Sequence, residues 1–207
     1  MKKIKTAIGL FVLSLSLWAC SPSGKKPDMY IEKAALTTQE LNMAKLLGAG
    51  DSPAIYDFKL DDTVQTIQFN TYELDQGQWR LMSGGGGHQF SDDTGRLAFD
   101  FQDLSEGLRT AFQSKGGSGA TAHSSVPAVK SDGMSAATSF LNGLTQVDYE
   151  EEIPLAVQII TSQSTVLSYD VDHYFTPEQY DSKGYEHVYA LTVRFSQKPL
   201  SQLDQQP

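Results

Sequence analysis

The sequence predicts a mainly β domain, an antiparallel β-sandwich of the immunoglobulin-like or jelly-roll-like kind, with one short N-terminal helix. Apolar and polar residues alternate with a period of two in several short segments, as in strands with one buried face. Turn-forming residues separate these segments, and about seven or eight such strands are typical of a sandwich. Hydrophobic residues make up 40% of the 207-residue chain, which is enough for one packed core.

The helix is expected over residues 38–47, ahead of most strands. Thr37 and Glu40 have the spacing of a capping box, and Leu36 and Leu41 can form a hydrophobic staple across it. Gly48 then supplies the left-handed residue that ends many helices.

The strand patterns come next. Alternation is found in residues 56–60, 67–69, 97–101, 108–112, 153–159 and 189–195. Tyr72 and Leu74 lie in the opposite phase from Phe69, which predicts a bulge near Asn70. Asp75-Gln76-Gly77 is typical of a hairpin loop with glycine in the left-handed position.

Two segments give weaker patterns. Residues 114–133 are rich in Gly, Ser, Ala and Thr and lack an apolar period, so we expect a flexible loop. Residues 132–144 fit a helix and a short strand about equally well.

The N-terminus has the pattern of an export signal. Three lysines among the first five residues precede an apolar stretch, residues 8–18, which is shorter than the roughly 20 residues of a spanning helix. The stretch ends in Leu17-Trp18-Ala19-Cys20, and Cys20 is the single cysteine of the chain. This arrangement resembles the bacterial lipoprotein signal.

The resemblance implies cleavage between Ala19 and Cys20 and a covalent diacylglycerol on the Cys20 thiol. The protein would then lie on the outer face of the cell membrane, or on an outer membrane if the organism has one. The domains expected are a signal peptide over residues 1–19, lipidated Cys20 with a flexible tether over 20–35, one β-rich extracytoplasmic domain over 36–200 and a disordered tail over 201–207.

Charge and cysteine content exclude some partners. Removing the three signal lysines from a formal net charge of −9 leaves −12. Such an acidic surface argues against nucleic acid, which requires clustered Lys and Arg. With its one cysteine assigned to the lipid, the domain has no disulfide partner. We expect no cofactor besides the covalent lipid.

No motif identifies a catalytic residue or a ligand-binding site. The glycine run at residues 84–87 lacks the lysine of a phosphate-binding loop and is expected to be a turn or a kinked sheet edge. The four histidines, His88, His123, His173 and His187, include no pair four residues apart of the zinc-binding kind.

Asp170 and Asp172 are weak calcium candidates, because two carboxylates two residues apart begin many calcium loops. Phe175 and Asp181 replace the Gly and Glu of an EF-hand, so only an irregular calcium site is open. Glu150-Glu151-Glu152 is expected to be a solvated start of a strand. The tyrosines between residues 169 and 189 are expected to pack in the core, with an exposed binding platform as the alternative.

The body of the chain resembles an uncharacterised family of small lipoproteins from low-GC Gram-positive bacteria of the clostridial kind. The resemblance implies a lipid-anchored envelope protein facing a Gram-positive wall and carries over no catalytic residue. The segments concerned are 71–74, 77, 79, 84–87, 94–98, 104–109, 137–141, 152–155 and 184–190.

The sequence therefore favours a lipid-anchored binding or assembly module for a wall glycan, a peptide or a membrane-protein partner. The alternative is a small extracytoplasmic hydrolase or metal-dependent enzyme. A concave pocket with converging Asp, Glu or His side chains would favour the enzyme. A flat sheet face lined by tyrosines would favour binding.

Overall fold

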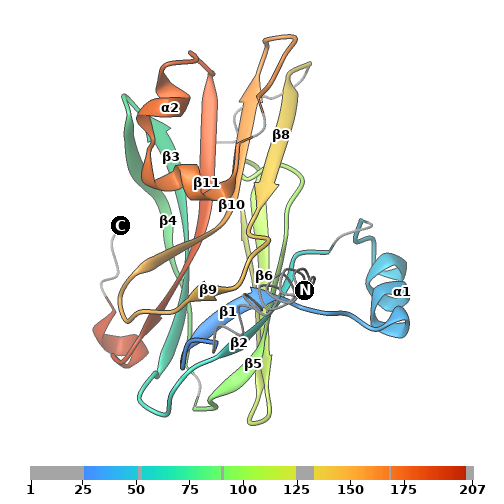
Figure 1. Ribbon diagram of the computed structural model, residues 1–207, viewed down its shortest axis with the longest axis vertical. Helices are drawn as coiled ribbons and strands as arrows, with labels where there is room; N and C mark the ends of the chain where they lie inside the picture. Colours follow the sequence, from blue (N-terminus) through green and yellow to red (C-terminus); the bar gives the residue numbers. More distant parts are fainter. Residues whose placement is uncertain (1–25, 51–52, 90, 125–132, 168, 204–207) are drawn as a thin grey trace, which may run out of the picture.

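The computed structural model is mainly β, with two antiparallel sheets packed face to face as a sandwich (Figure 1). The structure describes residues 26–50, 53–89, 91–124, 133–167 and 169–203. The predicted signal peptide, the cleavage site at Ala19 and Cys20, and residues 204–207 of the predicted tail lie outside the described residues.

The first sheet, sheet A, has the strand order β7-β6-β5-β2-β1-β9. Its strands are β1 (Tyr30–Lys33), β2 (Ile55–Lys59), β5 (Thr94–Asp100), β6 (Gly107–Ser114), β7 (Ser118–Ser124) and β9 (Thr145–Gln146).

The second sheet, sheet B, has the order β4-β3-β11-β10-β8. Its strands are β3 (Thr66–Asp75), β4 (Gln78–Gln89), β8 (Ser135–Phe140), β10 (Glu152–Thr161) and β11 (His187–Ser196).

Helical segments are few and short. They are α1 (Thr38–Leu46), η1 (Val171–Phe175), α2 (Glu178–Asp181) and η2 (Leu200–Gln202). Among the described residues, none of these helices is long and apolar enough to cross a membrane. α1 stands to one side of the sandwich on two connecting arms, whereas η1 and α2 lie against sheet B (Figure 1).

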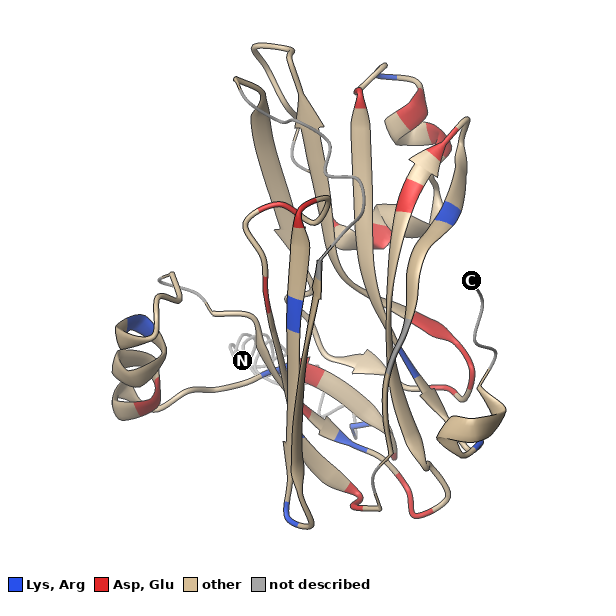
Figure 2. Cartoon of the chain, turned by 180° about the vertical axis from the view of Figure 1, so that it is seen from behind, with Lys and Arg blue, Asp and Glu red and all other residues tan. Residues whose placement is uncertain are grey.

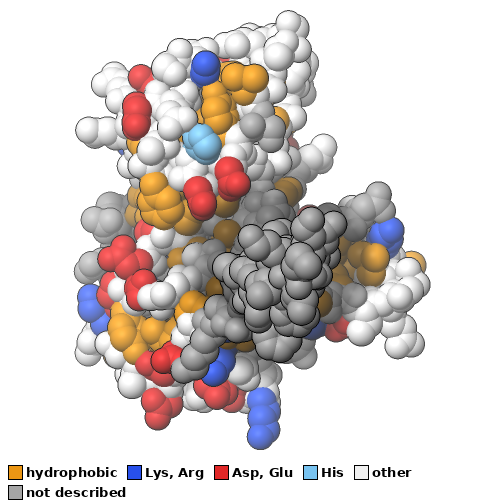
Figure 3. Space-filling model, viewed as in Figure 1, with side chains coloured by type: hydrophobic (Ala, Val, Ile, Leu, Met, Phe, Trp, Pro, Cys, Tyr) orange, Lys and Arg blue, Asp and Glu red, His pale blue; other side chains and the backbone are white. Residues whose placement is uncertain are grey.

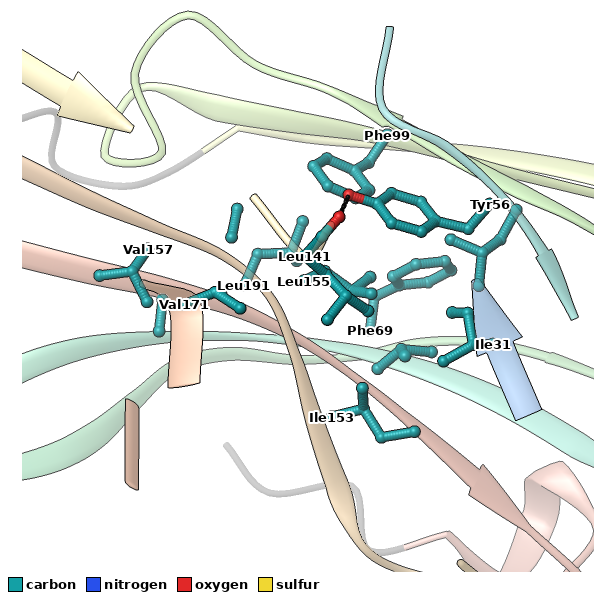
Figure 4. Packing of buried hydrophobic residues seen from close by; sticks show 14 of the residues in the cluster. Ile31, Tyr56, Phe69, Phe99, Leu141, Ile153, Leu155, Val157, Val171 and Leu191 are labelled. Carbon is teal, nitrogen blue, oxygen red and sulfur yellow. Dashed lines mark hydrogen bonds between the residues drawn. The ribbon is translucent and has the colours of Figure 1, made fainter. Parts of the chain in front are cut away.

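The core fills the space between the sheets (Figure 4). Phe58 of β2 meets Phe195 of β11 with ring centroids 5.9 Å apart, and Tyr56 stacks on Phe99 at 5.8 Å. The Tyr56 hydroxyl donates a hydrogen bond of 2.9 Å to the carbonyl of Leu141, just after β8. This bond joins the first sheet to the chain that leaves the second.

Several local expectations are confirmed. The pairing of β3 with β4 shifts register at Phe69/Asn70 and again at Thr71/Tyr72, where the change of phase predicts a bulge. Gln76 and Gly77 both have positive φ in the β3–β4 hairpin, and Gly48 has φ +96° after α1. The ambiguous segment at 132–144 contains a strand, β8.

The tether predicted over residues 20–35 is wrong in its last part. Residues 30–33 form β1, which pairs with β2 and β9, and Ile31 is fully buried. The isolated apolar residue in a four-residue strand gives too short a pattern to recognise from periodicity.

The loop predicted over residues 114–133 is also wrong in its first half, because Ser118–Ser124 forms β7. This strand can pack closely because it has no side chain at Gly119. A Cβ there would lie 2.5 Å from the Phe112 ring and 3.0 Å from His88. Small side chains make this strand without any apolar period.

The glycine run at residues 84–87 leaves room for the C-terminal segment to pack against β4. Residues 84–87 lie within β4 at the edge of sheet B and do not form a turn. A Cβ on Gly87 would meet Leu200 at 2.6 Å and Leu203 at 3.4 Å. The domain therefore extends beyond residue 200, since η2 and the buried Leu203 pack where glycine leaves room.

Candidate functional site

The outer face of sheet A carries a row of small apolar side chains. Leu97 and Phe99 of β5 point into the core, so the alternation of a strand turns Ala98 to the outside. Ala98 lies opposite Ile55 of β2 and Ala111 of β6, and Ala111 lies opposite Ala120 of β7. We call Ile55, Ala98, Ala111 and Ala120 the alanine row.

A polar row runs beside the alanine row on the same face. It consists of Asp57, Arg96, Gln113 and Ser118, again in direct register across four strands. Arg96 is its centre: Nε donates to Asp57 Oδ1 at 2.6 Å, and Nη1 donates to Glu40 Oε1 of α1 at 2.5 Å. One guanidinium thus ties the first turn of α1 to the sheet.

Glu40 serves the helix as well as the contact with the sheet. Its carboxylate accepts bonds of 2.7 Å from the Thr37 backbone N–H and 2.8 Å from the Thr37 hydroxyl, while the Glu40 N–H donates to Thr37 Oγ1. These bonds form the capping box. The bonds from Thr37 and the contact with Arg96 together lower the pKa of Glu40 from 4.5 to about 2.

A groove of about 690 Å³ lies where α1 and its return arm face the alanine row. This volume is within the range of small-molecule sites in proteins. Ala44, Leu47 and Pro53 line it from the side of α1, and Phe101 and Phe140 line it beyond the alanine row. We call this space the groove.

α1 buries none of its residues. Met43 is 58% exposed, Leu46 79% and Leu47 82%, and hydrophobic side chains of the helix appear at the surface in Figure 3. Of these three, Leu47 lines the groove, opposite the alanine row. Exposed apolar surface of this extent marks binding sites more often than ordinary surface.

Asp100 and Arg109 are the charged residues that line the groove. They are direct cross-strand neighbours on β5 and β6, one step along from Ala98 and Ala111. Elsewhere, acidic residues occupy the loops at both ends of the sandwich, with few lysines and arginines among them (Figure 2). The groove thus combines an apolar row with one charged pair beside its centre, Asp100 and Arg109.

The predicted calcium candidates have a local structural role. Asp170 is the N-cap of η1, and its side chain accepts from the Asp172 N–H. The described residues contain no group of three or more His, Cys, Asp or Glu side chains placed to hold a metal ion. Asp170 and Asp172 therefore do not form part of a larger ligand set.

His187 packs against its neighbours at the edge of the core. Its Nδ1 lies 3.5 Å from Glu73 Oε1, and its ring stacks on Tyr189 at 5.9 Å. The Ser105 hydroxyl donates to Asp103 Oδ1 at 2.6 Å, and Ser105 is fully buried. A hydroxyl used in this way is not prepared for nucleophilic attack.

The tyrosines near the C-terminus pack in most cases. Trp79 stacks on Tyr174 at 5.2 Å and donates from its indole N–H to the Tyr174 carbonyl at 2.8 Å. Tyr180 is 1% exposed, and Tyr189 is fully buried. Core packing is confirmed for these side chains, so they form no flat platform.

Glu152 also differs from the prediction of a solvated acidic run. Its carboxylate accepts 2.7 Å and 3.1 Å bonds from Asn70 Nδ2 and the Tyr72 hydroxyl, and it also accepts from Thr192. Asn70 and Thr192 are buried in the sheet beneath it. Glu152 fixes strand pairing on the outer face of sheet B.

The groove itself was missed by motif reasoning, because no chemical motif marks it. The available signal is alanine at the positions of β5, β6 and β7 that alternate with buried residues, where polar side chains are the norm. The approach of α1 to those positions depends on the Arg96 contact, which sequence spacing does not reveal.

Comparisons with known proteins add no name to these observations. No family model matches the chain, no curated protein matches it, and no solved structure matches it.

Proposed function

We propose that this protein is a lipid-anchored cell-envelope binding protein that takes the hydrocarbon chain of an amphiphile into the groove. The single observation that carries the proposal is the open apolar groove of about 690 Å³ between α1 and the alanine row. Burial of methylene groups there is favourable by about 0.8 kcal/mol each.

The chemistry of the lining favours this ligand over a wall glycan. A sugar requires several converging hydrogen-bond partners and commonly an aromatic platform. The groove instead presents apolar groups of alanine, leucine and proline, with its two charged residues, Asp100 and Arg109, side by side. Binding is also favoured over hydrolysis, because Asp100 and Arg109 offer no paired acid and base.

The proposal of a lipid anchor rests on the segment Leu17-Trp18-Ala19-Cys20, which resembles the bacterial lipoprotein signal. Acylation of Cys20 would place the domain at a membrane surface, and the tether of residues 20–29 ends at β1 of the same sheet that carries the alanine row. A binding site for amphiphiles is useful at such a surface, where they are concentrated.

The groove is tested with a soluble chain that begins at Ser21. The hydrophobic core runs from Ile31 to Phe195, so this chain keeps every core residue. The neutral fluorescent probe N-phenyl-1-naphthylamine should bind, and 1-dodecanol should displace it. Ala111→Phe fills the centre of the alanine row and should weaken 1-dodecanol binding at least tenfold, or about 1.4 kcal/mol.

The matched control is Gln113→Phe, on the same strand and the same face but in the polar row outside the groove. Its affinity should equal that of the parent chain. Absence of binding by the parent chain, or equal loss in both variants, would refute the groove as the site. Displacement by an apolar peptide but not by 1-dodecanol would identify a peptide site instead.

The anchor is tested separately in cells that process lipoproteins. Cys20→Ser should abolish labelling by a fatty-acid analogue and leave the protein released or as an uncleaved precursor. Unchanged lipid labelling of the variant would overturn the anchoring proposal without affecting the groove.

A further inference from the structure

We propose that the ligand of the groove carries an anionic head, a carboxylate in the simplest case, which binds Arg109. This inference rests on the proposed function and specifies the ligand class. The expected occupant is a single-chain amphiphile of the fatty-acid type, with its hydrocarbon over the alanine row and its head beside the row at Arg109.

The four arginines of the chain all lie in the described residues, and three of them have side-chain partners. Arg80 pairs with Asp75 at 2.8 Å, and Arg96 binds both Asp57 and Glu40. Arg194 donates to the amide oxygen of Gln68.

Arg109 differs from the other three. Among the described residues, no ion pair or hydrogen bond of its side chain is found, even though Asp100 lies directly opposite it across β5 and β6. Arg109, a lining residue of the groove, is therefore the arginine with its donors available.

Arg109 lies on the same face of sheet A as the alanine row. Along β6 it is two residues from Ala111, so both side chains lie on the outer face about 7 Å apart. Arg109 therefore flanks the centre of the row, where the head of a chain lying over Ala98 and Ala111 can turn to it. On the opposite flank of the row, Arg96 is already neutralised by two carboxylates.

The guanidinium of Arg109 is chemically suited to a carboxylate head. A guanidinium keeps its charge and presents five N–H donors in a planar fork that matches a carboxylate in bidentate fashion. Its long aliphatic stem can extend along an apolar surface beside a hydrocarbon ligand. Asp100 stands next to it, so this carboxylate opposes the charge of an anionic head and weakens the binding in the parent protein.

The experiment uses the soluble chain from Ser21 and three probes with the same tail: dodecanoate, 1-dodecanol and dodecyltrimethylammonium. The two ions are kept below their micelle concentrations and 1-dodecanol below its solubility limit. Isothermal titration should give the order dodecanoate, then 1-dodecanol, then dodecyltrimethylammonium, with about a tenfold span between the first and the last. Arg109→Gln should lower the dodecanoate affinity about tenfold and leave 1-dodecanol unchanged.

Two further variants test the charge argument in both directions. Asp100→Asn removes the opposing carboxylate and should raise the dodecanoate affinity several-fold. Arg80→Gln removes an exposed arginine far from the groove lining and should change nothing.

The outcomes separate this inference from the proposed function. Equal affinity for the three probes, or tightest binding of the cationic probe, would overturn the anionic head while leaving the groove in place. Loss of dodecanoate binding in Arg80→Gln as large as in Arg109→Gln would also overturn it. Failure of all three probes to bind would refute the groove itself.

Discussion

Arg96 connects three elements through one side chain. It joins β5 to β2 through Asp57 and joins the sheet to α1 through Glu40. Its guanidinium is about one-third exposed, so the contribution to overall stability is small. Its importance is geometric, because it sets the position of the helix that forms the wall of the groove.

The pKa of Glu40 tests whether its contacts with Thr37 and Arg96 persist in solution. Its pKa is lowered from 4.5 to about 2, chiefly by the Thr37 backbone N–H, then by the Thr37 hydroxyl and Arg96. A carboxyl with a depressed pKa in the folded state contributes stability above its free pKa. That contribution is lost as pH falls through the folded value. The capping box and the contact with Arg96 should therefore persist at pH 4 and fail as pH approaches 2.

A carbon-detected NMR titration of the Glu40 carboxyl measures this directly. Arg96→Ala should raise the pKa of Glu40, and Thr37→Ala should raise it as well, since each removes one stabilising partner. A Glu40 pKa near 4.5 in the parent protein would show that neither contact persists in solution.

At the residue scale, local chemistry was predictable where it depends on neighbours in the chain. The Thr37–Glu40 spacing and the left-handed Gly48 and Gly77 are examples. The contact between Glu40 and Arg96 joins residues 56 positions apart, so no local rule indicates it. The same reason explains why Arg109 could not be distinguished from the other arginines.

Among the elements, β5 has no room for a side chain at Gly95. A Cβ on Gly95 would lie 2.5 Å from the Gln113 carbonyl oxygen and 2.6 Å from the Phe58 ring. Because one obstacle is backbone and the other is a core side chain, neither can move freely. Gly95→Ala should therefore lower the free energy of unfolding by about 1 to 3 kcal/mol in urea denaturation.

Gly117, in the turn between β6 and β7, is the control for this substitution. Nothing lies within 4 Å of the position of its Cβ, and its φ is not positive. Gly117→Ala should change stability by no more than about 0.5 kcal/mol. Equal losses in the two variants would contradict the close approach at Gly95.

Strands with bulky alternating residues could be predicted, and strands built from small residues could not. β5 and β11 alternate large apolar side chains with polar ones. β7 pairs along its whole length with β6 but contains only Ser, Gly, Ala, Thr and His. Its stability comes from hydrogen bonding and close backbone approach, which hydrophobic periodicity does not register.

For the whole molecule, the class of fold was predictable but the order of strands was not. Neighbours such as β5 and β2, or β3 and β11, are distant in sequence. Their pairing depends on which faces bury most area together. The buried hydrogen bond from Tyr56 to Leu141 likewise joins distant parts of the chain, across the sandwich.

Tyr56→Phe should lower the free energy of unfolding by about 0.5 to 1.5 kcal/mol, because it removes a buried hydrogen bond at nearly constant volume. Tyr189→Phe is the matched control: Tyr189 is equally buried, and its hydroxyl has no hydrogen-bond partner among the described residues. Removing that hydroxyl should leave stability unchanged or raised. Equal destabilisation by both changes would rule out a specific contribution from the Tyr56 bond.

The absence of buried residues in α1 has a consequence for how the protein fluctuates. A helix attached by an ion pair and two chain arms can unfold while both sheets stay intact, so its amides should exchange with solvent far ahead of those in β10 and β11. The measured affinity of the groove then equals its intrinsic affinity multiplied by the fraction of time that α1 is folded. A ligand that binds only when α1 is folded would accordingly slow exchange in α1 first, by one plus the ratio of the free ligand concentration to the intrinsic dissociation constant.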